Sequence, residues 1–178
     1  MSAGPIVVLK LGGSVLQSER DLPRAVSEVY RCWRAGDRVL AVVSALGATT
    51  EELLRRAEQL GLPPRSPAFP AYLGGGEHAA ASLLALALHR AGLPATLLDA
   101  AAAGLRTTGD PRDAVPVALD RERVLAALAG GIAVLPGFVG RDGAGAATLL
   151  GRGGSDLTAL FVAAELGGAC TLLKDVGG

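Results

Sequence analysis

The chain has 178 residues, which is the size of one domain and enough to bury a substantial core. Lysine plus arginine and aspartate plus glutamate balance at 17 each, and aromatic residues make up only 3%, so we expect no nucleic-acid partner. Two cysteines without a recognisable leader favour a reducing, cytoplasmic location. The apolar stretches are too short, or too interrupted by glycine and proline, to predict a membrane span.

Strand-like and helix-like segments alternate along the chain. Apolar runs rich in β-branched residues predict strands, and apolar residues at helical spacing predict the helices between them. The strands are expected at residues 6–11, 38–44, 95–100, 132–138 and 169–175, and the helices at 21–35, 49–60, 77–91, 120–128 and 157–166. Residues 61–76, with four prolines, and residues 106–116 are predicted to be loops. Thr49 and Glu52 form a sequence match to a capping box at the start of the second helix.

This alternation predicts an α/β fold, a three-layer αβα sandwich with a mostly parallel central sheet. In such folds ligands bind outside the carboxyl ends of the strands. Lys10, Ser44 and Asp175 follow or end predicted strands, while Glu77 and the pair Ser155 and Asp156 begin predicted helices at the same rim. We therefore expect the site there.

A glycine-rich segment, Gly151-Arg152-Gly153-Gly154-Ser155-Asp156, precedes the last predicted helix. Glycines let the backbone direct its N–H groups toward a ligand, and a helix N-terminus favours anions. Ser155 is expected to cap the helix, and Arg152 to add a planar donor for a carboxylate or phosphate. An ordinary loop followed by an N-cap explains the same segment, which is neither a Walker loop nor a dinucleotide fingerprint.

Lysine is used in only two places, Lys10 and Lys174, against 15 arginines. A compact ammonium at Lys10, next to Gly12 and Gly13, suits a phosphate held by backbone amides. A solvated strand end is the alternative explanation for Lys10. Similarly, Glu77 and Asp156 could be helix-start carboxylates that complement the helix dipole, and Ser44 could be a turn residue.

Five motifs in order resemble the amino acid kinases, and among them the aspartate kinases. Lys10-Leu11-Gly12-Gly13-Ser14 is similar to that family's opening motif, and Val42-Val43-Ser44-Ala45-Leu46-Gly47 with Thr49-Thr50 to its second. Gly76-Glu77, Pro136-Gly137-Phe138 with the glycine-rich segment, and Asp175-Val176 complete the resemblance. The opening motif is equally similar to acetylglutamate and isopentenyl phosphate kinases.

The resemblance implies transfer of the γ-phosphoryl group of ATP, bound with Mg²⁺, to the β-carboxylate of L-aspartate. A carboxylate needs no general base, so the protein's task is to neutralise phosphate charge and align the substrates. By resemblance, the catalytic residues are Lys10 and Asp156, and the substrate is bound by Ser44, Glu77, Arg152 and Ser155. The phosphates and nucleotide are assigned to Lys10, Gly12, Gly13, Ser14, Lys174 and Asp175, and no residue is assigned to a protein-bound metal.

The sequence departs from the family at three positions, His78, Lys174 and Gly177, and ends soon after the fifth motif. We expect residues 1–178 to be an incomplete amino acid kinase domain that lacks the nucleotide-side portion and the regulatory domains. Such a chain should bind aspartate weakly and ATP little, and associate with itself or with the missing part.

Three functions stay open at this point. The chain is an aspartate kinase or part of one, a kinase of another acidic substrate such as acetylglutamate, or a non-catalytic module for substrate binding or subunit pairing. Glu77 and Arg152 together favour an acceptor with a free amine, which acetylglutamate lacks.

Overall fold

A computed structural model describes residues 4–173 of the chain. The strands are β1 (Ile6–Leu11), β2 (Arg38–Val43), β3 (Ala95–Leu97), β4 (Arg106–Asp110), β5 (Asp113–Ala118), β6 (Ile132–Pro136), β7 (Val139–Arg141), β8 (Ala147–Leu149) and β9 (Ala169–Leu173). The helices are the single turn η1 (Glu19–Asp21), α1 (Leu22–Arg34), α2 (Thr49–Gln59), α3 (Phe69–Leu73), α4 (Gly75–Arg90), α5 (Arg121–Gly130) and α6 (Gly154–Leu166).

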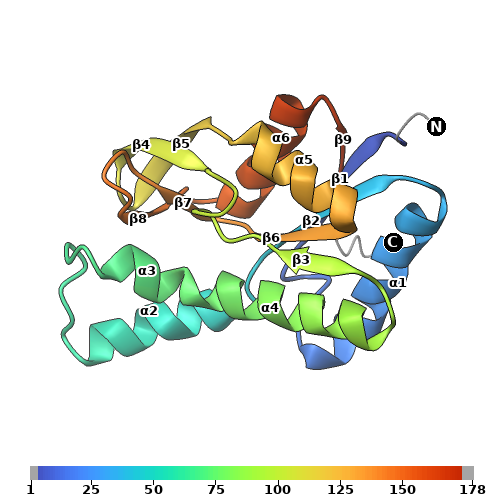
Figure 1. The fold of residues 1–178 in the computed structure, drawn as a ribbon. Helices are drawn as coiled ribbons and strands as arrows, with labels where there is room; N and C mark the ends of the chain where they lie inside the picture. The colour runs from blue at the N-terminus through green and yellow to red at the C-terminus, as the bar shows by residue number, and fades with distance from the viewer. Residues whose placement is uncertain (1–3, 174–178) are drawn as a thin grey trace.

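The central sheet has five strands in the order β3-β6-β2-β1-β9, and every pair is parallel. Figure 1 shows α5 and α6 above this sheet and α1 and α4 below it. The predicted three-layer αβα sandwich is therefore confirmed. Lys174 and Asp175, which the sequence assigned to the nucleotide, lie outside the described residues.

The two faces of the sheet bury separate cores because side chains alternate along each strand. On β1, Ile6 and Val8 pack with α5 and α6, whereas Leu9 and Leu11 pack with α1 and α4. Burial on both faces is possible because these strands are apolar almost throughout. Lys10, which is also buried, follows Val8 on the α6 side and is the exception.

Glycines with a left-handed backbone follow two of the helices and let the chain turn back toward the sheet. Gly36 follows α1 at φ 95° and Gly167 caps α6 at φ 65°, left-handed conformations that glycine adopts without strain. The predicted capping box of α2 is wrong: Ala48 is the cap residue, and the Thr49 hydroxyl donates to the carbonyl of Leu46.

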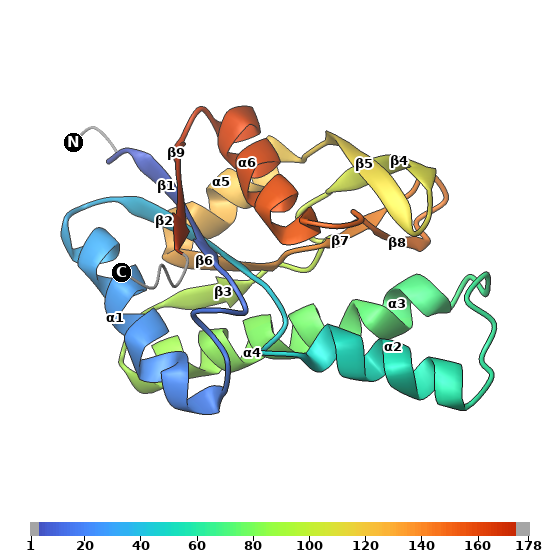
Figure 2. The ribbon, with the colours of Figure 1, turned by 180° about the vertical axis from the view of Figure 1, so that it is seen from behind.

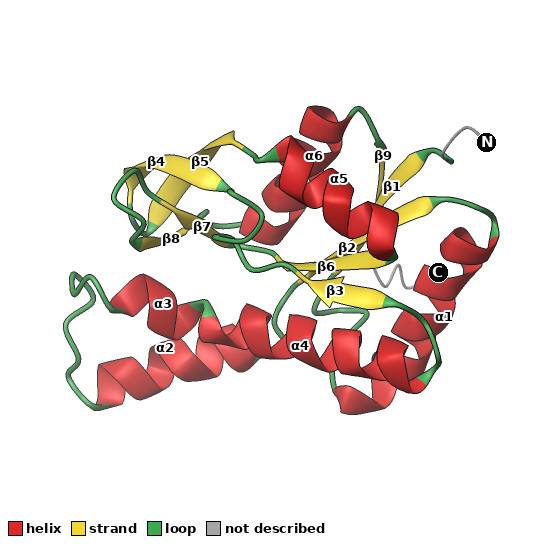
Figure 3. Cartoon of the chain, in the orientation of Figure 1, coloured by secondary structure: helices red, strands yellow, loops and turns green. Residues whose placement is uncertain are grey.

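A second, four-stranded sheet in the order β5-β4-β7-β8 was not predicted. Residues 106–116, expected to be a loop, contain β4 and most of β5, an antiparallel pair. In β5 the small residue Ala114 is buried, whereas the larger apolar residues Val115 and Val117 are more than half exposed. The pattern of apolar residues therefore does not show which face of β5 is buried. The expected loop 61–76 likewise contains α3 and the start of α4. Figure 3 shows this sheet and the α2–α3 pair beside one another, beyond one end of the central sheet.

Seen from behind, β1 lies between β2 and β9, so it is an interior strand of the sheet (Figure 2).

Within residues 4–173, no helix combines the length and apolar character that crossing a membrane requires.

Two leucines on α4 test this packing. Leu88 is fully buried between α4 and the sheet, while Leu86 on the same helix is 63% exposed. Leu88→Ala should lower the free energy of unfolding by about 2–5 kcal/mol, because it leaves a cavity. Leu86→Ala should change it by less than about 1 kcal/mol. Urea denaturation measures both, and equal losses would contradict the assigned faces of α4.

Candidate functional site

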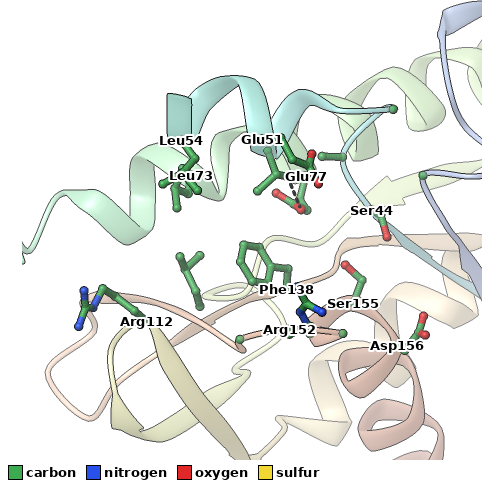
Figure 4. A pocket seen from close by; sticks show the side chains of 18 of the residues that line it. Ser44, Glu51, Leu54, Leu73, Glu77, Arg112, Phe138, Arg152, Ser155 and Asp156 are labelled. Carbon is green, nitrogen blue, oxygen red and sulfur yellow. Dashed lines mark hydrogen bonds between the residues drawn. The ribbon is translucent and has the colours of Figure 1, made fainter. Parts of the chain in front are cut away.

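A cavity of about 580 Å³ lies at the carboxyl ends of β1 and β2, between the α2–α3 pair and the glycine-rich loop before α6. Six residues that the sequence singled out, from four separate segments, line it: Lys10, Ser44, Glu77, Arg152, Ser155 and Asp156. Gly13 lines it as well. The structure thus brings most of the predicted site residues into one pocket, shown in Figure 4.

The glycine-rich loop forms one wall of the pocket. Gly151 and Gly153 have φ values of 65° and 75°, which lets the chain turn sharply before α6 begins at Gly154. The predicted cap is wrong, because Gly153 is the N-cap and Ser155 lies within the first turn. A side chain at Gly137 would lie 2.7 Å from Cβ of Ser155, so this glycine lets the β6–β7 connection pack on the helix start.

Lys10 and Asp156 form an ion pair, with 2.7 Å between Nζ and Oδ1. Lys10 is buried, and Asp156 lies in the first turn of α6. An added Cβ at Gly12 would lie only 2.8 Å from Nζ, so the absence of a side chain there leaves the ammonium its space. Since an ammonium has three donors, Lys10 can keep Asp156 and still donate to an anion in the pocket.

Of the residues predicted to bind phosphate in the turn after β1, only Gly13 lines the cavity. The Gly12 carbonyl accepts from the amides of Val15 and Leu16. Ser14 is exposed on the turn, and its carbonyl accepts from the side chain of Gln17. A role for Ser14 in phosphate binding stays a prediction.

Glu77 is the most unusual group in the pocket. It lies in the first turn of α4 and is only 4% exposed. Its Oε1 accepts a 3.4 Å hydrogen bond from the Thr50 hydroxyl, while Oε2 is buried with no hydrogen-bond partner among residues 4–173. Burial raises the pKa of Glu77 to about 7, helped by the charge of Glu51 and opposed by hydrogen bonds from backbone amides and Thr50. A cation next to Oε2 would satisfy both its charge and its lone pairs.

Arg152 and Ser44 lie around the same space as Glu77. Figure 4 shows Glu77 on the wall formed by α4 and Arg152 on the opposite wall, with Ser44 and Ser155 on the side toward Asp156. The Ser44 amide donates to the carbonyl of Leu11, which fixes the end of β2 against β1. The pocket therefore presents an acceptor and a forked donor across from each other, an arrangement suited to the ammonium and carboxylate of an α-amino acid.

Several pocket residues escaped sequence reasoning as site residues. Thr50 and Phe138 belong to motifs quoted above, which was the only signal for them. Phe138 has φ 66°, rare for a residue with a side chain, and its amide donates to the Thr158 hydroxyl. Arg112, at the turn between β4 and β5, lies at the outer end of the pocket (Figure 4). No sequence pattern pointed to Arg112, because its hairpin was taken for a loop.

Comparison with known proteins places the chain in a family. The sequence model of the amino acid kinase family matches residues 5–178. The chain belongs to the amino acid kinase family. The aspartokinase of Geobacillus stearothermophilus is 35% identical over 175 residues, which cover 97% of this chain and 43% of the relative. The chain thus spans less than half the length of this relative.

Solved structures of the amino acid kinase family share the fold. Aspartate kinase from Synechocystis superposes with a TM-score of 0.82 at 28% identity, over 97% of this chain and 28% of the other. E. coli aspartokinase III, in a structure with aspartate and ADP, gives a TM-score of 0.77 at 24% identity, over 97% of this chain and 50% of the other. Carbamate kinase from Giardia lamblia gives 0.69 at 17% identity, over 99% and 73%. At the latter two identities the likeness concerns the fold alone.

The buried carboxyl of Glu77 predicts a pH dependence of stability. Between pH 4.5 and about 7 the folded protein keeps a proton that the unfolded chain has released, so stability should fall as the pH rises through that window. Glu77→Gln removes this titration. Its stability relative to the unsubstituted protein should therefore increase by roughly 2 kcal/mol from pH 5.5 to pH 8.

Urea denaturation at the two pH values measures this difference. Glu58→Gln, which removes an exposed carboxyl on α2, is the matched control and should show little change. A Glu77→Gln difference that is the same at both pH values would contradict a carboxyl that is protonated in the folded state near pH 6.

Proposed function

We propose that this chain provides the acceptor side of an aspartate kinase site, where the γ-phosphoryl group of ATP is transferred to the β-carboxylate of L-aspartate. The observation that carries the proposal is the buried carboxyl of Glu77, whose Oε2 has no hydrogen-bond partner in the described part of the chain and which lies across the pocket from Arg152, in a pocket that also contains Lys10. The 35% identical aspartokinase relative supports the choice of substrates.

In this proposal Glu77 binds the ammonium of aspartate and Arg152 its α-carboxylate. The side chain then extends toward Lys10, the Gly13 backbone and the start of α6. Hydroxyls of Ser44 and Ser155 lie close enough to the pocket to add hydrogen bonds. N-acetylglutamate fits less well, because its amide carries no positive charge for Glu77.

The reaction is an in-line displacement. One oxygen of the β-carboxylate attacks the γ-phosphorus, and the bond from that phosphorus to the bridging oxygen of ADP breaks, giving aspartyl phosphate. Lys10 stabilises negative charge on the transferred group, while Asp156 positions the Lys10 ammonium through their ion pair. Mg²⁺ is expected to arrive on the phosphates of ATP; within residues 4–173 no cluster of three or more His, Cys, Asp or Glu side chains could hold a metal ion.

The first test concerns Lys10. In protein that forms aspartyl phosphate, Lys10→Met should slow the reaction about 10²–10³-fold, because a preorganised cation is lost from the developing charge. Trapping the acyl phosphate with hydroxylamine and quantifying aspartyl hydroxamate gives the rate. Turnover close to that of the unsubstituted protein would remove Lys10 from the mechanism.

The second test separates the two substrates. Glu77→Gln and Arg152→Ala should each raise the KM for aspartate about 30-fold, since a charged group of the bound substrate loses its partner, and should change the KM for ATP much less. Arg121→Ala, which removes an exposed guanidinium on α5, is the control for loss of positive charge. If both pocket variants lost ATP affinity and kept aspartate affinity, the assigned roles would be wrong.

The oligomeric state of the chain is a separate question from its catalytic chemistry. Association of the chain with itself or with further kinase segments stays a prediction, which analytical ultracentrifugation of the purified protein tests directly.

A further inference from the structure

The pocket has two chemically different halves. The half toward Asp156 carries the charged and hydroxyl groups already described. The other half is apolar and is formed by Leu54 of α2, Phe69 and Leu73 of α3, and Leu149 of β8. Figure 4 shows Phe138 between the two, with Leu54 and Leu73 on one side and Ser155 and Asp156 on the other.

The apolar half is a fixed wall. Leu149, Leu73 and Phe69 are nearly buried, and together with Ala57 they form a small core between the α2–α3 pair and the second sheet. Leu54 is 40% exposed and lines the cavity beside them. The charged residues at this half, Glu51 and Arg112, lie on its borders. A ligand that covers the exposed surface of Leu54 removes apolar area from water, which makes the free energy of binding more favourable.

In the proposed binding mode aspartate does not contact this wall, because its single methylene and second carboxylate are directed toward Lys10. The contacts that recognise its backbone, Glu77 and Arg152, are nevertheless the same for every α-amino acid. The direction of the side chain is then decided by solvation: a carboxylate is stabilised near Lys10, and a hydrocarbon is stabilised near Leu54.

We propose that the apolar half is a second side-chain subsite, so that the pocket also binds α-amino acids with an apolar side chain of about the size of leucine. This inference rests on the proposed function through the contacts of Glu77 and Arg152. The apolar amino acid presents no second carboxylate to the phosphoryl donor, so it is not phosphorylated and competes with aspartate for the same backbone contacts.

The test is competition between L-leucine and L-aspartate, measured by calorimetry on the purified protein. We expect leucine to bind with 1:1 stoichiometry and to be displaced by aspartate. Isopentylamine, which has the same hydrocarbon and amine but no carboxylate, should bind at least about tenfold more weakly than leucine, since it leaves Arg152 without a partner.

Leu54→Ala distinguishes the subsite from general amino acid binding. It should weaken leucine relative to aspartate by about fivefold or more, because the ligand loses apolar contact area. Leu60→Ala, which removes an exposed leucine at the end of the same helix, should leave the ratio of the two affinities unchanged. Circular dichroism confirms that both variants are folded.

Each outcome is decisive. Binding of aspartate without leucine, or an affinity ratio that responds equally to both leucine variants, overturns the second subsite and leaves the proposed function standing. Failure of both amino acids to bind overturns the proposed function and the inference together.

Discussion

The ion pair between Lys10 and Asp156 is the interaction around which the site is built. Lys10 is a charged residue in a strand that is buried on both faces, and an ammonium in that position is stable only with a compensating charge. Asp156 supplies the charge from the first turn of α6, and the ion pair thereby connects β1 to the helix that follows the glycine-rich loop. The position of this pair therefore links β1, the helix start and the pocket wall.

Glu77 has the opposite environment, since its carboxyl is buried and forms no ion pair with any residue between 4 and 173. Burying a carboxylate costs free energy, and the raised pKa is the sign of that cost. Such a group does little for the stability of the folded chain, but it is well suited to bind an ammonium that enters the pocket. Lys10 and Glu77 thus prepare the two ends of one cavity for groups of opposite charge.

The central sheet could be predicted from the sequence because its strands are continuous apolar runs between helices of regular period. Ligands bind at the carboxyl ends of parallel strands, and from this rule we predicted that Lys10, Ser44 and Glu77 lie at one site. All three line the same pocket. The second sheet could not be predicted, because β5 turns Val115 and Val117 toward solvent and β7 and β8 have only three residues each. The apolar wall of the pocket was missed for the same reason: it joins α2 and α3 to β8, which requires the tertiary structure. The prediction that Ser155 caps α6 was wrong because Gly153, with a left-handed backbone, occupies the N-cap position that a serine usually prefers.

The most direct measurement is a ¹³C NMR titration of the Glu77 side-chain carboxyl, with and without L-aspartate. Without ligand the carboxyl should titrate near pH 7. In the presence of saturating L-aspartate its pKa should fall well below that value, because an ammonium next to Oε2 favours the charged form. Succinate, which has both carboxylates but no amine, should not lower it. A pKa that is unchanged by aspartate, or lowered equally by succinate, would contradict an amino acid site built around Glu77.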